Sequence, residues 1–153
     1  MKLRLYQDKT LKQDHVDIHY RMMTPILKKV IGVLEGAHTV LHLYGKTNKD
    51  EQVLIKISDI YYFDYVDRRT FAYLRDEMYQ VQESLAKLEV HLADEGFVRI
   101  NKSNVVNIHH IQAIKPEVNM RVKAIMENEE CLIINRSYKA NFKSYLEERR
   151  HVL

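Results

Sequence analysis

The stretch FVRINKSNVVN, residues 97–107, decides how this chain is built and what it can bind. Its apolar residues indicate two short strands with a buried face: Phe97, Val98, Ile100, Val105 and Val106. Its polar residues lie between and beside these strands: Arg99, Asn101, Lys102, Ser103 and Asn107. Each of these side chains can hydrogen-bond a phosphate or a base edge, and together they form no catalytic set. The stretch therefore indicates a binding protein, and nucleic acid is the partner that this set favours.

The bulk composition is that of a folded domain with an uneven charge distribution. A chain of 153 residues with 46% hydrophobic residues forms one domain, or one domain with an extension. The net charge is only +3. However, residues 50–96 carry 5 Lys and Arg against 11 Asp and Glu, whereas residues 97–153 carry 10 against 6. The C-terminal third therefore has a local positive field that the net charge hides.

The chain has one cysteine and no sign of a targeting segment. Cys131 lies in the apolar run CLII, which predicts a buried thiol that acts as a small hydrophobic side chain. The first residues, MKLRLYQDKT, lack the apolar region of a signal peptide. No window approaches the ~20 apolar residues of a membrane span. We therefore expect a soluble cytoplasmic protein.

The first fifty residues predict a small α+β segment. Alternation of polar and apolar residues predicts strands at 2–7 and 16–22. Thr24 as a cap and Pro25 at the first helical position predict a helix that ends near Gly36. A strand is expected at 38–45, and GKTNKDE, residues 45–51, predicts a turn or a domain boundary.

From residue 52 onward the pattern is mostly that of β-strands. Tyrosine and β-branched residues dominate QVLIKI, SDIYYFDYVD, RRTFAYL and EMYQV, and later NVVNI, QAIKP, MRVKAIM and CLIIN. Ser84 can cap a short helix that has Leu85, Leu88 and Leu92 on one side. A last helix is expected to begin between Asn135 and Ser137. Its inward-facing residues would be Tyr138, Phe142, Tyr145 and Leu146.

Three ordered blocks within residues 50–150 resemble the LytTR family, a mostly β DNA-binding domain found at the C-terminus of many bacterial response regulators. DIYYFDYVDRRTFAYL, residues 59–74, is similar to the family's hydrophobic strand, acidic residue, polar hairpin and returning strand. FVRINKSNVVNIHHI, residues 97–111, resembles its pattern of Phe, Arg, a polar pair, Ser, two apolar residues and Asn. IINRSYKANFKSYL, residues 133–146, is similar to its closing strand, Arg-centred turn and terminal helix. The chain departs from the family at Asn101, where many members have His.

The resemblance implies an α+β fold that is mostly β. A LytTR-like, strand-rich DNA-binding domain with short helices and a C-terminal helix would occupy residues 49–150, and a small α+β extension would occupy residues 1–48. The extension is too short for a receiver domain, so the chain is similar to stand-alone LytTR regulators. Those proteins are often encoded beside a small membrane protein that restrains them. Residues 1–48 are therefore a candidate region for dimer formation or partner binding.

The resemblance also implies that three loops, and no recognition helix, contact successive grooves of a DNA duplex. In the first loop, a bidentate arginine on guanine would contribute roughly 1–3 kcal/mol of discrimination. In the second loop, Asn101 and Lys102 are the expected groove readers. In the third, exposed amides at a helix start would favour a phosphate. The expected DNA-binding residues are Arg68, Arg69, Arg99, Asn101, Lys102, Ser103, Asn107, Arg136, Ser137, Tyr138 and Lys139.

Several of these residues also have a purely structural interpretation. Arg68 and Arg69 can be two solvated charges at a turn. Ser103 and Asn107 can satisfy backbone groups of a polar turn between two strands. Arg136 can form a salt bridge at a helix terminus, although a cation at that end opposes the helix dipole.

Catalytic and metal-binding functions lack support in the sequence. His109 and His110 are adjacent, so in a strand they would point to opposite faces and could not readily share one ion. Asp64 and Asp67 have no accompanying base or nucleophile, and a turn or cap role fits them better. We therefore expect no enzyme activity, no cofactor, no metal and no small-molecule substrate.

The sequence thus predicts a bacterial transcription regulator that binds promoter or operator repeats in double-stranded DNA, as a homodimer. One alternative is a protein-interaction module that docks to a membrane partner through its extension and has weak independent DNA affinity. Another is a general binder of single-stranded nucleic acid, although most of the 10 tyrosines lie in apolar strands and indicate core positions. No motif identifies the operator, the regulated genes, the direction of regulation or the controlling signal.

Overall fold

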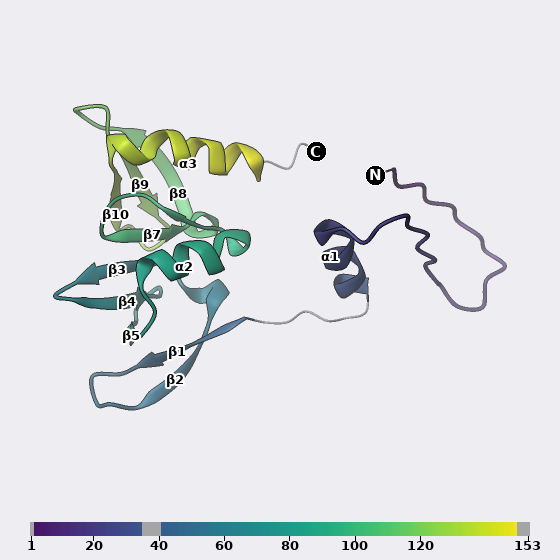
Figure 1. Ribbon diagram of the computed structural model, residues 1–153, viewed down its shortest axis with the longest axis horizontal. Helices are drawn as coiled ribbons and strands as arrows, with labels where there is room; N and C mark the ends of the chain where they lie inside the picture. The colour runs from purple at the N-terminus through teal and green to yellow at the C-terminus, as the bar shows by residue number, and fades with distance from the viewer. Residues whose placement is uncertain (1, 35–40, 150–153) are drawn as a thin grey trace. The chain divides into compact units, whose positions relative to one another are not determined.

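The computed structural model describes residues 2–34 and 41–149, which belong to two compact units (Figure 1). The units divide the chain between residues 39 and 40, earlier than the boundary between residues 48 and 49 that the sequence led us to expect. The difference arises because β1 (His42–Lys46) pairs with β2 (Gln52–Lys56) as an antiparallel hairpin. The expected turn is present between them, where the Asp50 amide donates to the Thr47 carbonyl at 3.1 Å. The first strand therefore belongs to the sheet of the second unit.

The first unit contains one helix and no strand among its described residues. α1 (Pro25–Leu34) begins as expected, because the Leu27 amide donates to the Thr24 hydroxyl at 3.2 Å. The expected helix end at Gly36 and the first residues of the strand expected at 38–45 lie outside the described residues. The strands predicted at 2–7 and 16–22 are absent, so those predictions were wrong. Alternation alone does not make a strand unless a neighbouring strand completes its backbone hydrogen bonds.

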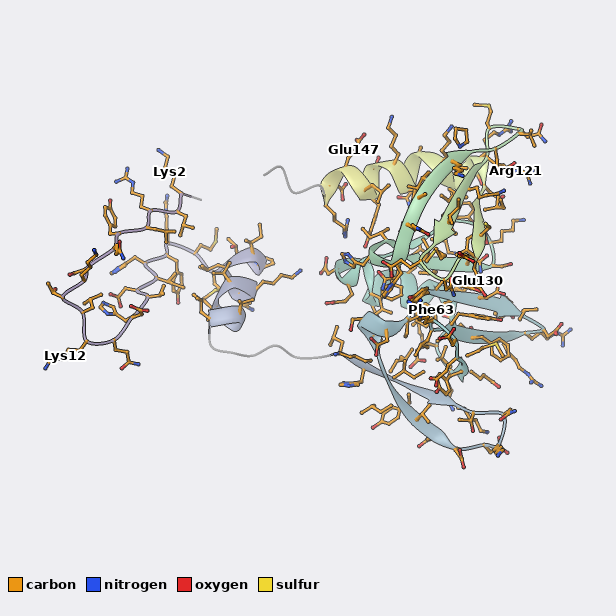
Figure 2. The ribbon with its side chains drawn as sticks, turned by 180° about the vertical axis from the view of Figure 1, so that it is seen from behind. Lys2, Lys12, Phe63, Arg121, Glu130 and Glu147 are labelled. Atoms are coloured by element: carbon orange, nitrogen blue, oxygen red, sulfur yellow. The ribbon has the colours of Figure 1, made fainter. Side chains whose placement is uncertain are left out.

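This first unit buries little apolar surface. Leu27 is the one buried apolar side chain among residues 2–34, whereas Leu3 is 82% exposed and Ile26 is 67% exposed. Figure 2 shows Lys2 and Lys12 extending outward from this unit. A segment of this length with almost no core obtains little stability from its own packing.

A seven-stranded antiparallel sheet forms the centre of the second unit, in the order β2-β1-β5-β4-β3-β7-β6. The strands that follow β2 are those predicted from the tyrosine-rich and β-branched runs, and their predictions are confirmed. They are β3 (Tyr62–Val66), β4 (Arg69–Tyr73), β5 (Met78–Val81), β6 (Phe97–Arg99) and β7 (Asn104–Asn107).

One face of this sheet is covered by α2 (Leu85–His91), as the leucine spacing predicted. Ser84 caps the helix by accepting a hydrogen bond from the Lys87 amide at 3.3 Å. Leu85, Leu88 and Leu92 pack in one core with residues of the sheet, among them Phe63, which is fully buried (Figure 2). Short 3₁₀ turns connect these elements: η1 (Ile57–Asp59), η2 (Ala93–Glu95) and η3 (Ile108–His110).

The other face of the sheet packs, at its β3-β7-β6 end, on a second core. A three-stranded sheet in the order β10-β9-β8 and the last helix enclose this core (Figure 1). These elements are β8 (Ile111–Pro116), β9 (Val122–Met126), β10 (Cys131–Ile134) and α3 (Arg136–Glu148). The stretch 97–107 serves both cores, because Phe97 and Val105 lie in the first and Val98, Ile100 and Val106 lie in the second.

Two local predictions in this region were wrong. Cys131 is exposed, because in β10 it is Leu132 and Ile134 that point into the core. His109 and His110 lie in η3 and not in a strand. Among residues 2–34 and 41–149, no three His, Cys, Asp or Glu side chains are placed to hold a metal ion, and no helix is long and apolar enough to cross a membrane.

Candidate nucleic-acid interface

The three segments predicted to contact DNA lie side by side in the second unit. The middle segment is the turn 101–103 between β6 and β7. The Tyr65 amide of β3 donates to the Ser103 carbonyl at 2.8 Å, which joins this turn to the β3–β4 hairpin. The Asn135 amide donates to the Ile100 carbonyl at 3.0 Å, which joins the start of α3 to the end of β6. Backbone hydrogen bonds thus bring segments that are far apart in sequence into one continuous region.

The β3–β4 hairpin ends in a two-residue turn, Asp67-Arg68. Val66 and Arg69 are partners in the strand register, and both turn residues have positive φ angles of 51° and 61°. This conformation favours Gly and Asn, so the turn holds an arginine in a strained backbone. Arg68 and Arg69 are exposed, and neither forms an ion pair with any described residue. Both guanidinium groups are therefore available to a ligand.

Arg99 is engaged inside the protein and not free for a phosphate. Its Nε donates to the Asn101 carbonyl at 2.9 Å, and its Nη2 donates to the Lys102 carbonyl at 2.6 Å. Its Nη1 lies 3.6 Å from Glu89 Oε2 of α2. The side chain therefore holds the backbone of the 101–103 turn through two of its carbonyls.

Asn101, expected to read a groove, has its whole amide occupied by protein groups. Its Oδ1 accepts hydrogen bonds from the Ser103 and Asn104 amides, both at 2.8 Å. Its Nδ2 donates to Asn104 Oδ1 at 3.0 Å and to the Ile133 carbonyl at 2.9 Å. A side-chain amide has two donor hydrogens and two acceptor lone pairs, so no capacity is left for a base edge. The structure therefore gives Asn101 a role in holding the turn, which differs from the expected groove contact.

Lys102 and Ser103 are the outward-facing residues of the middle turn. Lys102 is exposed, and its ammonium forms no ion pair with any described residue. Ser103 is half-buried, and its hydroxyl forms no hydrogen bond within the described part of the chain. Lys102 is thus the cation that this turn presents to solvent.

Asn107, also expected at the DNA surface, is a core residue. It is 1% exposed, its Nδ2 donates to the Ile60 carbonyl at 2.9 Å, and its Oδ1 accepts from the His109 amide at 3.1 Å. A buried amide that pairs with two backbone groups cannot also reach a duplex. The expected DNA contact is therefore replaced by the structural role that the sequence had left open.

The start of α3 presents a second group of cations. Arg136, Ser137 and Lys139 are exposed, whereas Tyr138 is half-buried against the second core. Asn135 precedes the helix but makes no side-chain cap. The Tyr138 amide donates to the Asn135 carbonyl at 2.9 Å, which leaves the Arg136 and Ser137 amides of the first turn for a ligand. Arg136, Lys139 and the exposed Lys143 follow helical spacing, so they lie along one side of α3.

Asn104 is a further residue of this region that the sequence patterns did not indicate. Its Nδ2 donates to Asp64 Oδ1 at 3.0 Å and to the Phe63 carbonyl at 3.2 Å. Asn104 and Asp64 are opposite each other in the β3–β7 register. The available signal was an Asn and an Asp inside two apolar strands, since such residues are disfavoured in strands unless they find partners.

Burial changes the acid–base properties of the groups behind the interface. It raises the pKa of the Asp64 carboxyl, and the hydrogen bonds from Asn104 and the Tyr65 backbone only partly oppose this effect. Burial, together with a hydrogen bond to the Glu130 carboxylate, also raises the pKa of Tyr62, whose ring stacks on Tyr73 at 4.6 Å. Burial raises the pKa of Tyr73 as well, so the stacked pair favours the neutral form of both phenols.

Comparison with known proteins identifies the family of the second unit. The sequence profile of the LytTr DNA-binding domain matches residues 50–147. The chain belongs to the LytTR family. The matched residues run from the β1–β2 turn to the last turn of α3, so they include all three segments of the interface.

Relatives of this LytTR protein occur in several bacteria. An uncharacterised HTH-type transcriptional regulator of Staphylococcus aureus is 27% identical over 149 residues, which cover 95% of this chain and 98% of the relative. The sensory transduction protein LytT of Bacillus subtilis is 23% identical, over 92% of this chain and 58% of its own length. A solved LytTr DNA-binding domain from Bacillus cereus is similar in structure, with a TM-score of 0.65 and 27% identity, over 69% of this chain and 95% of that domain.

The architecture of this LytTR domain differs from a helix-turn-helix. Within residues 41–149 the two α-helices, α2 and α3, are separated by the five strands β6 to β10. A helix-turn-helix needs two helices joined by a short turn. The described part of the second unit therefore presents loops and a helix start, and no recognition helix, beside its exposed cations.

Proposed function

We propose that this LytTR protein is a sequence-specific regulator of bacterial transcription that binds double-stranded DNA through three neighbouring segments. The observation that supports this most is the placement of exposed cations from the hairpin, the middle turn and the start of α3, none of which pairs with a described acidic group, along one hydrogen-bonded region. The family and the names of its relatives point to the same activity. No comparison favours the interaction-module alternative.

The proposed contacts divide into groups that touch DNA and groups that hold them. The direct contacts are Arg68, Arg69, Lys102, Ser103, Arg136, Ser137 and Lys139. Arginine at the hairpin is suited to a guanine edge, and lysine at the turn is suited to a guanine edge or a phosphate. The supporting residues are Arg99, Asn101 and Tyr138, whereas Asn107 is a core residue that serves the stability of the sheet. The arrangement fits successive contacts along one side of a duplex.

We further propose that the chain acts as a homodimer in the cytoplasm. Repeated half-sites are normally bound by paired subunits, and the first unit supplies an apolar surface for pairing. Its helix exposes Ile26, Val33 and Leu34, which need a covering surface. A second copy would cover them, and a small membrane protein is the alternative partner for the same residues.

A mobility-shift series on the DNA upstream of the gene tests this function. The specific duplex is compared with a scrambled duplex and with single strands over a range of salt concentrations. We expect specific duplex binding whose log affinity falls linearly with log salt, because phosphate contacts release counterions. Equal affinity for the scrambled duplex would contradict sequence-specific regulation, and a preference for single strands would favour the alternative nucleic-acid function.

A further inference from the structure

Two asparagine side chains connect the three proposed contact segments. Asn101 lies in the middle turn and reaches the Ile133 carbonyl of β10, which leads directly into α3. It also donates to Asn104 Oδ1 at 3.0 Å. Asn104 in turn reaches Asp64 and the Phe63 carbonyl of β3, the strand that leads into the β3–β4 hairpin. One uninterrupted run of hydrogen bonds therefore extends from the strand before α3 to the strand before Arg68.

The chemistry of this run depends on the side-chain amide. Asn101 uses one oxygen to close the turn on the Ser103 and Asn104 amides, and one nitrogen to cross to β10 and Asn104. An aspartate has no donors, and a serine is too short to span both directions. Asn is therefore the residue that can close the turn and fix its distance from β10 at the same time.

The backbone under Lys102 is held from both sides. Arg99 holds the Lys102 carbonyl, and Asn101 holds the amide of the next residue, Ser103. The Lys102 side chain itself remains exposed and without an ion pair to any described residue. A fixed backbone that carries an exposed ammonium is expected of a pre-organised contact. The turn then loses less conformational entropy when it binds DNA.

We propose that Asn101, Asn104 and Asp64 form a clamp that sets the spacing of the three DNA-contacting segments. They are positioning residues, and their effect on recognition is exerted through Lys102, Arg136 and the hairpin arginines. The clamp rests on the proposed DNA-binding function. In the middle turn, Lys102 is then the side chain that contacts DNA, because the neighbouring Asn101 amide forms all its hydrogen bonds within the protein.

The clamp is tested with the full chain and two variants of its central residue. Asn101→Ala removes all four hydrogen bonds, and Asn101→Ser keeps a short acceptor for the turn but loses the reach to Ile133. Neither variant changes the charge. Val81→Ala is the matched control, because Val81 is buried in the first core with α2 and its truncation lowers stability without removing a hydrogen bond between the three segments. All four proteins are compared at a temperature far below their unfolding transitions.

Affinity for the specific duplex is measured over a salt series, and hydrogen exchange is measured on the free proteins. We expect Asn101→Ala to weaken specific binding about tenfold and to lower the slope of log affinity against log salt by about one, although no charge is lost. Asn101→Ser should fall between Asn101→Ala and wild type. The Ser103 and Asn104 amides should lose exchange protection in Asn101→Ala, while amides in the rest of the sheet keep theirs. Val81→Ala should keep the wild-type affinity and slope.

The possible outcomes separate the clamp from the proposed function. If the wild-type chain binds no duplex, the proposed function is wrong, and the DNA role of the clamp falls with it. If the wild type binds but Asn101→Ala retains its affinity and salt slope, the clamp alone is wrong. If affinity falls equally in Asn101→Ala and Val81→Ala, Asn101 acts only through global stability and the positioning role is wrong.

Discussion

The amide of Asn135 donates a hydrogen bond to the carbonyl of Ile100 at 3.0 Å. This bond fastens the residue before α3 to the residue before the middle turn. It explains how the start of α3 with Arg136 and the β6–β7 turn with Lys102, which come from different sequence blocks, lie side by side. The proposed DNA interface is therefore a property of strand packing and not of any single motif.

Replacing Lys102 or Arg136 with alanine should weaken DNA binding with little change in stability. Both side chains are exposed and form no ion pair with any described residue, so their removal costs the fold little. Each substitution should lower the salt slope of specific binding by about one, as expected for the loss of one phosphate contact. Lys49→Ala is the control, since Lys49 lies in the β1–β2 turn at the opposite edge of the sheet from β7. Thermal unfolding of either test variant at a much lower temperature would assign it a structural role.

Arg68→Gly should change stability and affinity in opposite directions. Arg68 has a φ of 61° in a two-residue turn, and glycine after aspartate is the preferred sequence for such a turn. Relief of the backbone should raise the free energy of unfolding by about 0.5–1 kcal/mol. Loss of the guanidinium should reduce specific DNA affinity. Urea unfolding and a mobility shift measure the two effects, and a variant that binds as tightly as wild type would remove Arg68 from the interface.

Asp64→Asn should stabilise the protein at neutral pH and not at low pH. Burial raises the pKa of Asp64 in the folded state, so the folded protein binds a proton more tightly there than the unfolded chain. The stabilising contribution of this proton is complete below about pH 4, which is the pKa of an aspartate in the unfolded chain. It is lost as the pH rises through the higher pKa that Asp64 has in the folded protein. Asparagine keeps an oxygen for Asn104 and carries no charge. Urea unfolding from pH 4 to pH 7 should show a difference from wild type that grows with pH, and a constant difference would contradict this explanation.

Asn107→Ala should reduce stability and leave DNA binding by the folded protein unchanged. The substitution leaves the Ile60 carbonyl and the His109 amide without their partner in a buried site. Each such loss costs about 1–3 kcal/mol. Chemical denaturation gives the free energy of unfolding, and the affinity is measured well below the transition. If a fully folded Asn107→Ala variant lost DNA affinity, Asn107 would have to contribute to DNA binding.

Deletion of residues 1–39 should convert a dimer into a monomer that still binds a single half-site. The first unit exposes apolar side chains of α1 and has almost no core of its own, which fits a surface that needs a partner. The second unit contains both cores and the whole proposed interface. Light scattering after gel filtration should report the change in mass, and DNA with two repeats should lose more affinity than DNA with one. If the truncated chain remained a dimer, the surface that forms the dimer would have to lie in the second unit.

Much of the second unit followed from local patterns in the sequence. The alternating and β-branched runs predicted the strands from β2 onward, and Ser84 and Asn135 marked the starts of two helices. The same kind of pattern failed at 2–7 and 16–22, where no neighbouring strand is present among the described residues. The predicted burial of Cys131 was wrong for a related reason, because an apolar run does not show which alternate residues face the core.

The sequence by itself determined which side chains could serve a nucleic-acid interface, since residue type sets hydrogen-bonding capacity and charge. Only the tertiary structure decided which of them are free to do so. Asn101 and Asn107 have the same side chain as any groove-reading asparagine, yet their amides are occupied by the Ile133 and Ile60 carbonyls from distant segments of the chain. Lys102 and Arg136, by contrast, are exposed and form no ion pair within the described part of the chain. Hydrogen bonds across the sheets have no signature in local sequence, because their partners are brought together only when the strands pack.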